Sequence, residues 1–264
     1  MRDDFSISKI AFYCSAIFVY IFIWTPVLVL VFYSFNSSKI SVGWEGATLK
    51  WYSWVVNNPQ VLRAFFLSFI VSIVTVIVNV PLGALTAYGL FKYKFKSRSA
   101  LRYVILLPIL VPEVILGGAL LLYFRQFVGI RLGYFTVIAA HILYTLPLAT
   151  FVLLSRMQRI NWSLEEASMD LGANWPKTIR KVIIPQLMPG IIGSIMIVFP
   201  WSYNNFVLTY FVSGLGGTTL PIYVFGMMRT GINPGINAIG SLVIFGMIFV
   251  ILSISWLQKR GNQS

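Results

Sequence analysis

Side chains capable of acid–base, nucleophilic or metal chemistry are few in this sequence, and they lie far apart. The 264 residues include 7 Asp and Glu, 1 His and 1 Cys. Within the long apolar stretches there is one carboxylate, Glu113, one imidazole, His141, and one thiol, Cys14, each in a different stretch. Enzyme active sites bring acids, bases or nucleophiles into hydrogen-bond reach of one another. We therefore disfavour a membrane enzyme, and we expect no catalytic residues and no bound metal.

Glu113 is the only acidic residue inside an apolar stretch. Placing a carboxylate at the centre of a membrane helix costs about 2.5–3.5 kcal/mol, so such residues usually face a polar cavity or the interior of a helix bundle. One interpretation is that Glu113 lines a solute path and attracts a cation. The other is that it pairs with a neighbouring helix or with a backbone group freed by Pro108 or Pro112.

A second polar group lies in a later apolar stretch, where Asn204 and Asn205 follow Pro200. Transporters often bind solutes at breaks in membrane helices, so we expect the two amides to contact the solute. Ser202 and Tyr203 precede them and join the candidate site. The rings of Tyr203 and Trp201 near the amides can both attract cations. Packing and hydrogen bonding between helices are the alternative roles for these side chains.

A third group of residues indicates protein docking. Ser163 and Glu166 have the spacing of a capping box, which predicts a helix beginning there. Gly172 is suited to end that helix in a left-handed conformation. Asn174 is a favourable N-cap for a second helix, and Pro176 fits its first turn. A compact helix–glycine–helix unit with charged residues indicates a surface on which another protein docks. A solvated pair of connecting helices is the alternative.

The elements that carry these groups are membrane spans. Hydrophobic residues make up 58% of the chain and charged residues 10%, with a mean hydropathy of +0.83, whereas soluble domains carry roughly 25% charged residues. Six stretches reach the ~18–20 apolar residues that cross a bilayer. They are Ile10–Tyr33, Leu62–Leu90, Leu101–Phe124, Tyr134–Leu154, Leu187–Val212 and Ala238–Leu257. We predict an all-α integral membrane protein with one domain over residues 1–264.

The distribution of basic residues sets the expected orientation. Of the 20 Lys and Arg residues, fourteen lie before the first stretch, between the second and third, between the fourth and fifth, or after the sixth, when Arg102 at the very start of the third is counted with them. The positive-inside rule then places both termini and the long connection Ser155–Gln186 in the cytoplasm. The net charge of +13 orients the chain and meets anionic lipid headgroups, so nucleic acid is not an expected partner.

The long cytoplasmic connection also carries a recognisable motif. Glu166-Ala167-Ser168 is followed after three residues by Gly172 and after nine more by Val182-Ile183-Ile184-Pro185. This spacing resembles the EAA signature of permeases from binding-protein-dependent ABC importers. Further segments are similar to PotC-type spermidine/putrescine permeases. They are Phe35–Ser38, Lys50–Tyr52, Pro112-Glu113, Ala167–Ala173 and Phe211–Gly214.

The resemblance implies a type I importer permease (MetI-like) fold with six transmembrane helices in a bacterial inner membrane. It implies four kinds of partner: two ATPase subunits, a second, paralogous permease, an extracytoplasmic solute-binding protein and lipid. It assigns contact with the ATPase to Glu166, Ala167, Asp170, Gly172 and Pro185, and it adds Trp51 to the solute path. The chain has no Gly-x4-Gly-Lys-Ser/Thr motif, so ATP and Mg would belong to the ATPase and no cofactor to this chain. Such a coupling loop argues against a passive channel.

One difference from the family affects the expected solute. Polyamine permeases carry two adjacent aspartates where this chain has Asn204-Asn205. Two carboxylates favour a di- or polycation more strongly than two neutral amides do. We expect a polyamine, spermidine or putrescine, as the solute. An amino-acid derivative, an organophosphonate or another small zwitterion is the alternative.

Overall fold

The computed structural model describes residues 2–38, 43–214, 216–231 and 234–261, and helices dominate these ranges. The described residues form no strand, apart from an isolated bridge between Asn36 and Ala47. The helices are α1 (Arg2–Tyr33), α2 (Lys50–Asn57), α3 (Pro59–Lys92), α4 (Arg98–Leu110), α5 (Glu113–Leu122), η1 (Tyr123–Phe127), α6 (Tyr134–Met157), α7 (Ser163–Asp170), α8 (Trp175–Thr178), η2 (Ile179–Ile183), α9 (Ile184–Asn204), α10 (Val207–Val212), α11 (Leu220–Thr230) and α12 (Pro234–Gly261).

Helix length and composition support the predicted membrane class. Among the described residues, five helical segments are long and apolar enough to cross a bilayer: Ala11–Tyr33, Pro59–Lys92, Tyr134–Met157, Trp175–Asn204 and Pro234–Ser253. The bent pair α4 and α5 makes a sixth candidate when it is counted as one span. The expectation of an all-helical chain built around six apolar segments is therefore confirmed.

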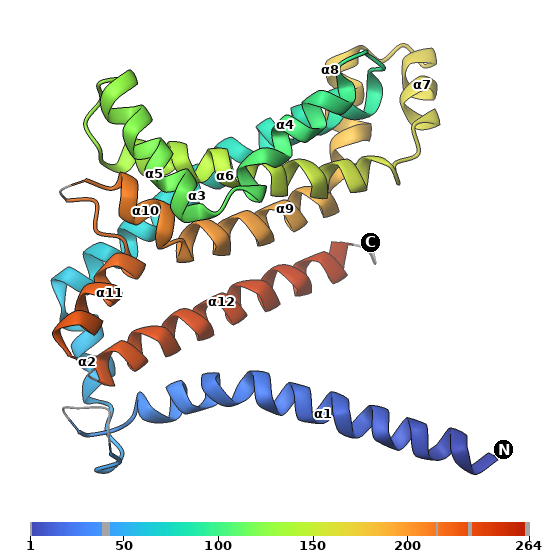
Figure 1. Ribbon diagram of the computed structural model, residues 1–264. Coiled ribbons are helices and arrows are strands. Elements are labelled where there is room, and N and C mark those ends of the chain that lie inside the picture. The colour runs from blue at the N-terminus through green and yellow to red at the C-terminus, as the bar shows by residue number, and fades with distance from the viewer. Residues whose placement is uncertain (1, 39–42, 215, 232–233, 262–264) are drawn as a thin grey trace. The chain divides into compact units, whose positions relative to one another are not determined.

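The third segment differs from its prediction as one continuous helix over Leu101–Phe124. Helix α4 ends at Leu110, α5 begins at Glu113, and the pair is bent by 100° (Figure 1). Pro112 explains the break, because proline has no amide hydrogen and disfavours helical geometry in the residue before it. Val111 accordingly adopts an extended conformation, with ψ of 130°.

The fifth segment is also interrupted, although the sequence analysis drew it as one stretch over Leu187–Val212. Helix α9 already begins at Ile184 and runs to Asn204, and α10 starts three residues later at Val207. Asn205 lies between them with an extended backbone, at φ −69° and ψ 114°. Pro200 stays within α9, so the chain breaks after the amide pair rather than at the proline.

The structure divides into two compact units. The first contains Met1–Leu62 and Val224–Phe249, and the second contains Arg63–Tyr223 and Val250–Ser264. In the first unit the indole Nε1 of Trp51 donates to the Asn36 carbonyl at 2.8 Å, and the Asn36 side-chain oxygen accepts from the Glu45 amide at 3.0 Å. Apart from Trp51, all candidate site residues lie in the second unit.

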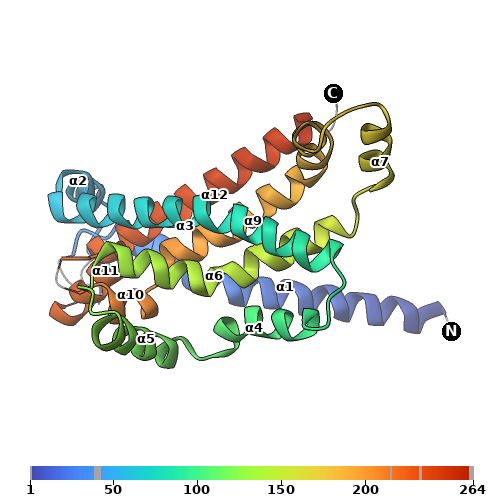
Figure 2. The same ribbon diagram turned by 90° about the horizontal axis from the view of Figure 1, so that it is seen from above.

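The second unit is organised around α6 and α9, which run side by side (Figures 1 and 2). One cluster of its buried side chains joins the end of α3 to both helices. Its members are Ala87, Leu90, Leu153, Leu154, Met157, Ile160 and Leu187. At Gly83 an added Cβ would lie 2.9 Å from the Ala149 Cβ, so a small residue is needed where α3 meets α6. Small residues allow this close approach of membrane helices.

Candidate functional site

A cleft of about 480 Å³ lies where the two interrupted segments meet. The start of α5, the end of α9 and the start of α10 surround it, and α5 packs directly against α10. Its lining consists of Glu113, Pro200, Trp201, Asn204, Asn205, Phe206 and Val207. Three of the predicted solute-path residues, Glu113, Asn204 and Asn205, therefore come together in one cleft.

Asn205 fixes this arrangement through both ends of its side-chain amide. Its Nδ2 donates to the Glu113 carboxylate at 3.1 Å. Its Oδ1 accepts from the backbone N–H groups of Leu208 at 3.0 Å and Thr209 at 3.4 Å. The amide thus satisfies N–H groups in the first turn of α10, as an N-capping side chain does. Glu113 therefore pairs with a neighbouring helix, as one interpretation held, and it also lines the cleft.

Two stacked aromatic rings lie at the cleft that Glu113 lines. Trp201 lines the cleft and stacks on Tyr144 of α6, with ring centroids 4.4 Å apart and planes inclined by 24°. Tyr144 also lies close enough to Glu113 to interact with it electrostatically. A cleft lined by both a carboxylate and an indole is a favourable environment for an ammonium group, which both attract.

Ser202 and Tyr203 occupy a different environment. Among the described residues, the cleft lining includes neither of them. The Ser202 hydroxyl is hydrogen-bonded to His141 Nδ1 at 2.8 Å, and His141 Nε2 to the Thr209 hydroxyl at 2.9 Å. Tyr203 is 4% exposed and contacts Phe65 and Phe199. These side chains hold α6, α9 and α10 together behind the cleft.

Sequence reasoning considered Trp201 with Tyr203 as an aromatic face for a cation but kept only Tyr203 in the candidate site, although a signal favoured Trp201. Residues three and four positions apart share one face of a helix, whereas immediate neighbours do not. Trp201 is three residues before Asn204, so helical periodicity places these two on one face of α9. The same periodicity turns Ser202 and Tyr203 toward other faces. Trp51 lies in the other unit, where the Lys50 ammonium is 5.6 Å from the centre of its ring.

The predicted docking unit is present as two short helices around Gly172. Helix α7 ends at Asp170, and Gly172 has φ of +81°, the left-handed conformation that its position requires. Asn174 caps α8, because its Oδ1 accepts from the Lys177 N–H at 3.2 Å. Pro176 occupies the first turn, as predicted. The chain then continues through η2 into α9.

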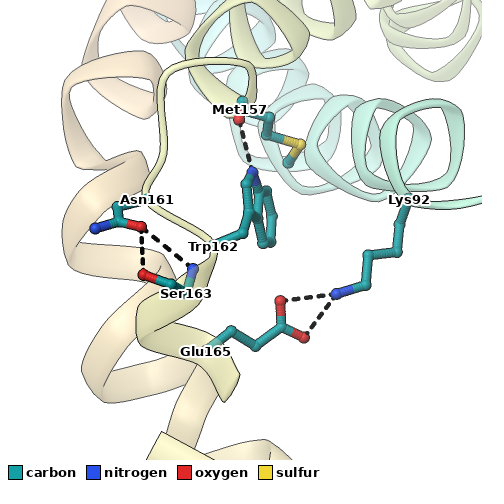
Figure 3. A network of polar contacts seen from close by, with 6 residues as sticks. All are labelled: Lys92, Met157, Asn161, Trp162, Ser163 and Glu165. Atoms are coloured by element: carbon teal, nitrogen blue, oxygen red, sulfur yellow. Dashed lines mark hydrogen bonds and ion pairs between the residues drawn. The ribbon is translucent and has the colours of Figure 1, made fainter. Parts of the chain in front are cut away.

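The predicted capping box is wrong. Ser163 is the first residue of α7 rather than its cap, and it makes no capping bond to Glu166. Its N–H and hydroxyl instead donate to Asn161 Oδ1, at 3.2 Å and 2.7 Å (Figure 3). Asn161 Oδ1 thus accepts from the Ser163 N–H, the hydrogen bond that the pattern assigned to the Glu166 carboxylate. The Glu166 side chain is consequently directed into solvent.

All five residues that the resemblance assigned to ATPase contact are exposed. Large apolar side chains accompany them, with Leu171 89% exposed and Trp175 48% exposed. Leu171 lies outside the segments that are apolar enough to cross a membrane. Trp175 is the first residue of one such segment. Exposed apolar surface rimmed by polar residues is typical of a protein interface.

Comparisons with known proteins agree with this architecture. Residues 79–263 match the family model described as "Binding-protein-dependent transport system inner membrane component". The chain is 30% identical over 253 residues to the spermidine/putrescine transport system permease protein PotC of Escherichia coli K12, covering 95% of each. It is 34% identical to the putrescine transport system permease protein PotI of the same strain, covering 92% of this chain and 88% of PotI.

Solved structures show the same fold at low sequence identity. A bacterial ABC transporter that imports the acidic polysaccharide alginate aligns with a TM-score of 0.74 at 16% identity, over 96% of this chain and 95% of that chain. The MetNI methionine ABC transporter aligns with a TM-score of 0.57 at 16% identity, over 79% and 95%. The chain is a non-catalytic membrane permease component, and it belongs to the family of inner membrane components of binding-protein-dependent transport systems.

Proposed function

We propose that this chain forms the solute path of an ATP-driven polyamine importer, with spermidine or putrescine as the solute. The observation that carries the proposal is the cleft that joins Glu113 to the indole of Trp201. A primary ammonium needs a negative charge and a surface that replaces its hydration, and a carboxylate and an aromatic face supply them. The names of the relatives PotC and PotI support a polyamine as the cation.

The strength of this recognition depends on a single charge. A carboxylate and an ammonium about 4 Å apart attract each other by about 4 kcal/mol at an effective dielectric constant of 20. Desolvation of both groups offsets part of that attraction. With neutral amides at Asn204 and Asn205, Glu113 is the only carboxylate among the described residues that line the cleft. It would hold one ammonium group, and the rest of a polyamine would contact amides, the indole and the partner permease.

The proposed assembly has two permeases, this chain and a paralogue, with two ATPase subunits and an extracytoplasmic solute-binding protein. ATP and Mg would be bound by the ATPase, which would dock on the exposed surface around α7 and Gly172. Both chain termini would be cytoplasmic. A related structure supports the binding-protein partner, since the alginate transporter was solved in complex with a periplasmic protein.

A zwitterionic solute is the second candidate, and the amide pair favours it. Asn204 lines the cleft with an exposed side chain that offers both a donor and an acceptor. A carboxylate or phosphonate group could accept from this amide while the amino group of the same molecule approached Glu113. An amino-acid derivative or an organophosphonate would satisfy these contacts.

Uptake by the complete importer in membrane vesicles tests the two candidates. Labelled putrescine and spermidine are supplied with the solute-binding protein and ATP, and glycine betaine and aminoethylphosphonate serve as competitors. ATP-dependent polyamine accumulation that neither competitor reduces is the expected result. Accumulation of a zwitterion without any polyamine uptake would contradict the proposal.

A further inference from the structure

An ion pair joins the last residue of α3 to the first turn of α7. The Lys92 ammonium donates to both carboxylate oxygens of Glu165, at 3.0 Å and 2.9 Å (Figure 3). Glu165 is 5% exposed, which separates it from its exposed neighbour Glu166. Buried carboxylates are rare unless paired, so the contact with Lys92 explains why a glutamate is tolerated here.

Trp162 supports this ion pair from the residue just before α7. The Lys92 ammonium lies 5.3 Å from the centre of the Trp162 ring, within cation–π range. The ring stacks on Phe91 with centroids 5.0 Å apart, and its Nε1 donates to the Met157 carbonyl at 3.0 Å. The start of α7 is therefore held against the ends of both α3 and α6 (Figure 3).

The second short helix has its own contact with α3. Tyr88 packs edge-to-face on Trp175 of α8, with centroids 6.3 Å apart. It also lies 6.2 Å from Trp162. Trp162, just before α7, and Trp175 of α8 thus both contact the last turns of α3. By contrast, the side that carries Glu166 and Leu171 is exposed.

Helix α3 continues from these contacts toward the cleft. It is one unbroken helix of 34 residues. At its far half, Val71 packs in a buried cluster with Val212 of α10 and Ala140 of α6. Helix α10 begins at the cleft residue Val207 and is capped by Asn205. A displacement of α7 that moves α3 would therefore reach the Asn205–Glu113 contact through packed side chains.

We propose that the Lys92–Glu165 ion pair, seated on Trp162, is the positioning contact that transmits movement of α7 to α3 and so to the solute path. This inference rests on the proposed importer function. Lys92 and Glu165 touch neither solute nor ATP in this scheme. Their role is to make α7 and α3 move as one body, because removing Lys92 would leave the buried Glu165 carboxylate without its charge partner.

The test uses the complete importer with Lys92→Met, Glu165→Met and the double variant, and Lys94→Met as the matched control. Lys94 is an exposed basic residue two positions after Lys92. We expect each single variant to assemble with its ATPase and to keep basal ATP hydrolysis. Putrescine uptake and the stimulation of hydrolysis by the binding protein should both fall about tenfold, within the range seen for residues that carry coupling. If the two residues form one link, the double variant should lose no more uptake than either single variant.

Three results would overturn the inference. They are single variants that keep wild-type uptake and stimulation, losses that simply add in the double variant, and losses that follow reduced ATPase association or membrane abundance. The last would assign the pair to docking or folding. These results can be distinguished from failure of the proposed polyamine function, because in that case the wild-type complex itself would not accumulate putrescine. Stimulation of ATP hydrolysis by the binding protein would still report on the ion pair in that case.

Discussion

The Asn205 amide donates to the Glu113 carboxylate at 3.1 Å, which ties one helix break to the other across 92 residues of sequence. Glu113 begins α5 after the Pro112 break, and Asn205 separates α9 from α10. A hydrogen bond to a charged group contributes about 1.5–3 kcal/mol, enough to hold the two breaks in register. A solute that binds Glu113 therefore acts on both interrupted segments.

Replacing Glu113 with Gln should reduce uptake of putrescine at least about tenfold, equivalent to about 1.4 kcal/mol of lost attraction. Glutamine keeps the shape of the side chain and removes only the charge. The measurement is the initial uptake rate, with membrane abundance checked by immunoblot. Unchanged uptake would leave Glu113 with a structural role and favour a neutral or zwitterionic solute.

The two neighbouring amides should respond in opposite ways to added charge. Asn204→Asp adds a carboxylate at an exposed lining position and should raise spermidine uptake severalfold, because spermidine carries several positive charges. Asn205→Asp places a second carboxylate about 3 Å from Glu113, where like charges repel. It should lower uptake and thermal stability. Equal effects of the two variants on spermidine uptake and melting temperature would contradict this assignment.

Gly172→Val should disrupt docking of the ATPase. A β-branched residue at φ of +81° costs about 1–2 kcal/mol and re-aims α8 relative to α7. We expect normal membrane insertion, weaker recovery of the ATPase in pull-downs and little uptake. Gly89→Val is the control, since an added Cβ there meets no atom within 4 Å and the backbone angle is ordinary. An intact, active Gly172→Val complex would refute the docking role.

The C-terminus should lie in the cytoplasm, as the asymmetry of basic residues predicts. A reporter that is active only outside the cytoplasm, fused after Ser264, should stay inactive, and a fusion in the connection between α5 and α6 should be active. Ser264 itself lies outside the described residues. An active C-terminal fusion would place the docking unit on the wrong side for a cytoplasmic ATPase.

Local patterns predicted much of this structure because they reflect local physics. Apolar length located the spans, and the conformational needs of Gly172, Asn174 and Pro176 located the elbow between α7 and α8. The break at Pro112 was also readable, because proline restricts the residue before it, although the span was drawn as one helix. The proline near the amide pair pointed to a break in the fifth span, which was drawn as one stretch, but the helix ends after the amides rather than at Pro200.

Long-range pairings could not be predicted in this way. Lys92 and Glu165 are 73 residues apart, and the position of Glu165 beside Glu166 gave no sign that one is buried and the other exposed. Asn161 takes the place of the Glu166 carboxylate as acceptor for the Ser163 N–H, because the turn before α7 brings the Asn161 side chain there. The grouping of Glu113 with Trp201 likewise depends on how α5 packs against α10.

The 100° bend between α4 and α5 decides how many times the chain passes through the hydrocarbon core. Thirteen helical residues extend about 20 Å and ten about 15 Å, and neither reaches the roughly 30 Å of the core alone. If the two halves traverse it together, the number of passages is even and the chain finishes on the side where it began. If they dip in and turn back, the number is odd and the ends face opposite compartments. A pair of reporters on the two termini thus measures the path of the backbone at Val111 and Pro112.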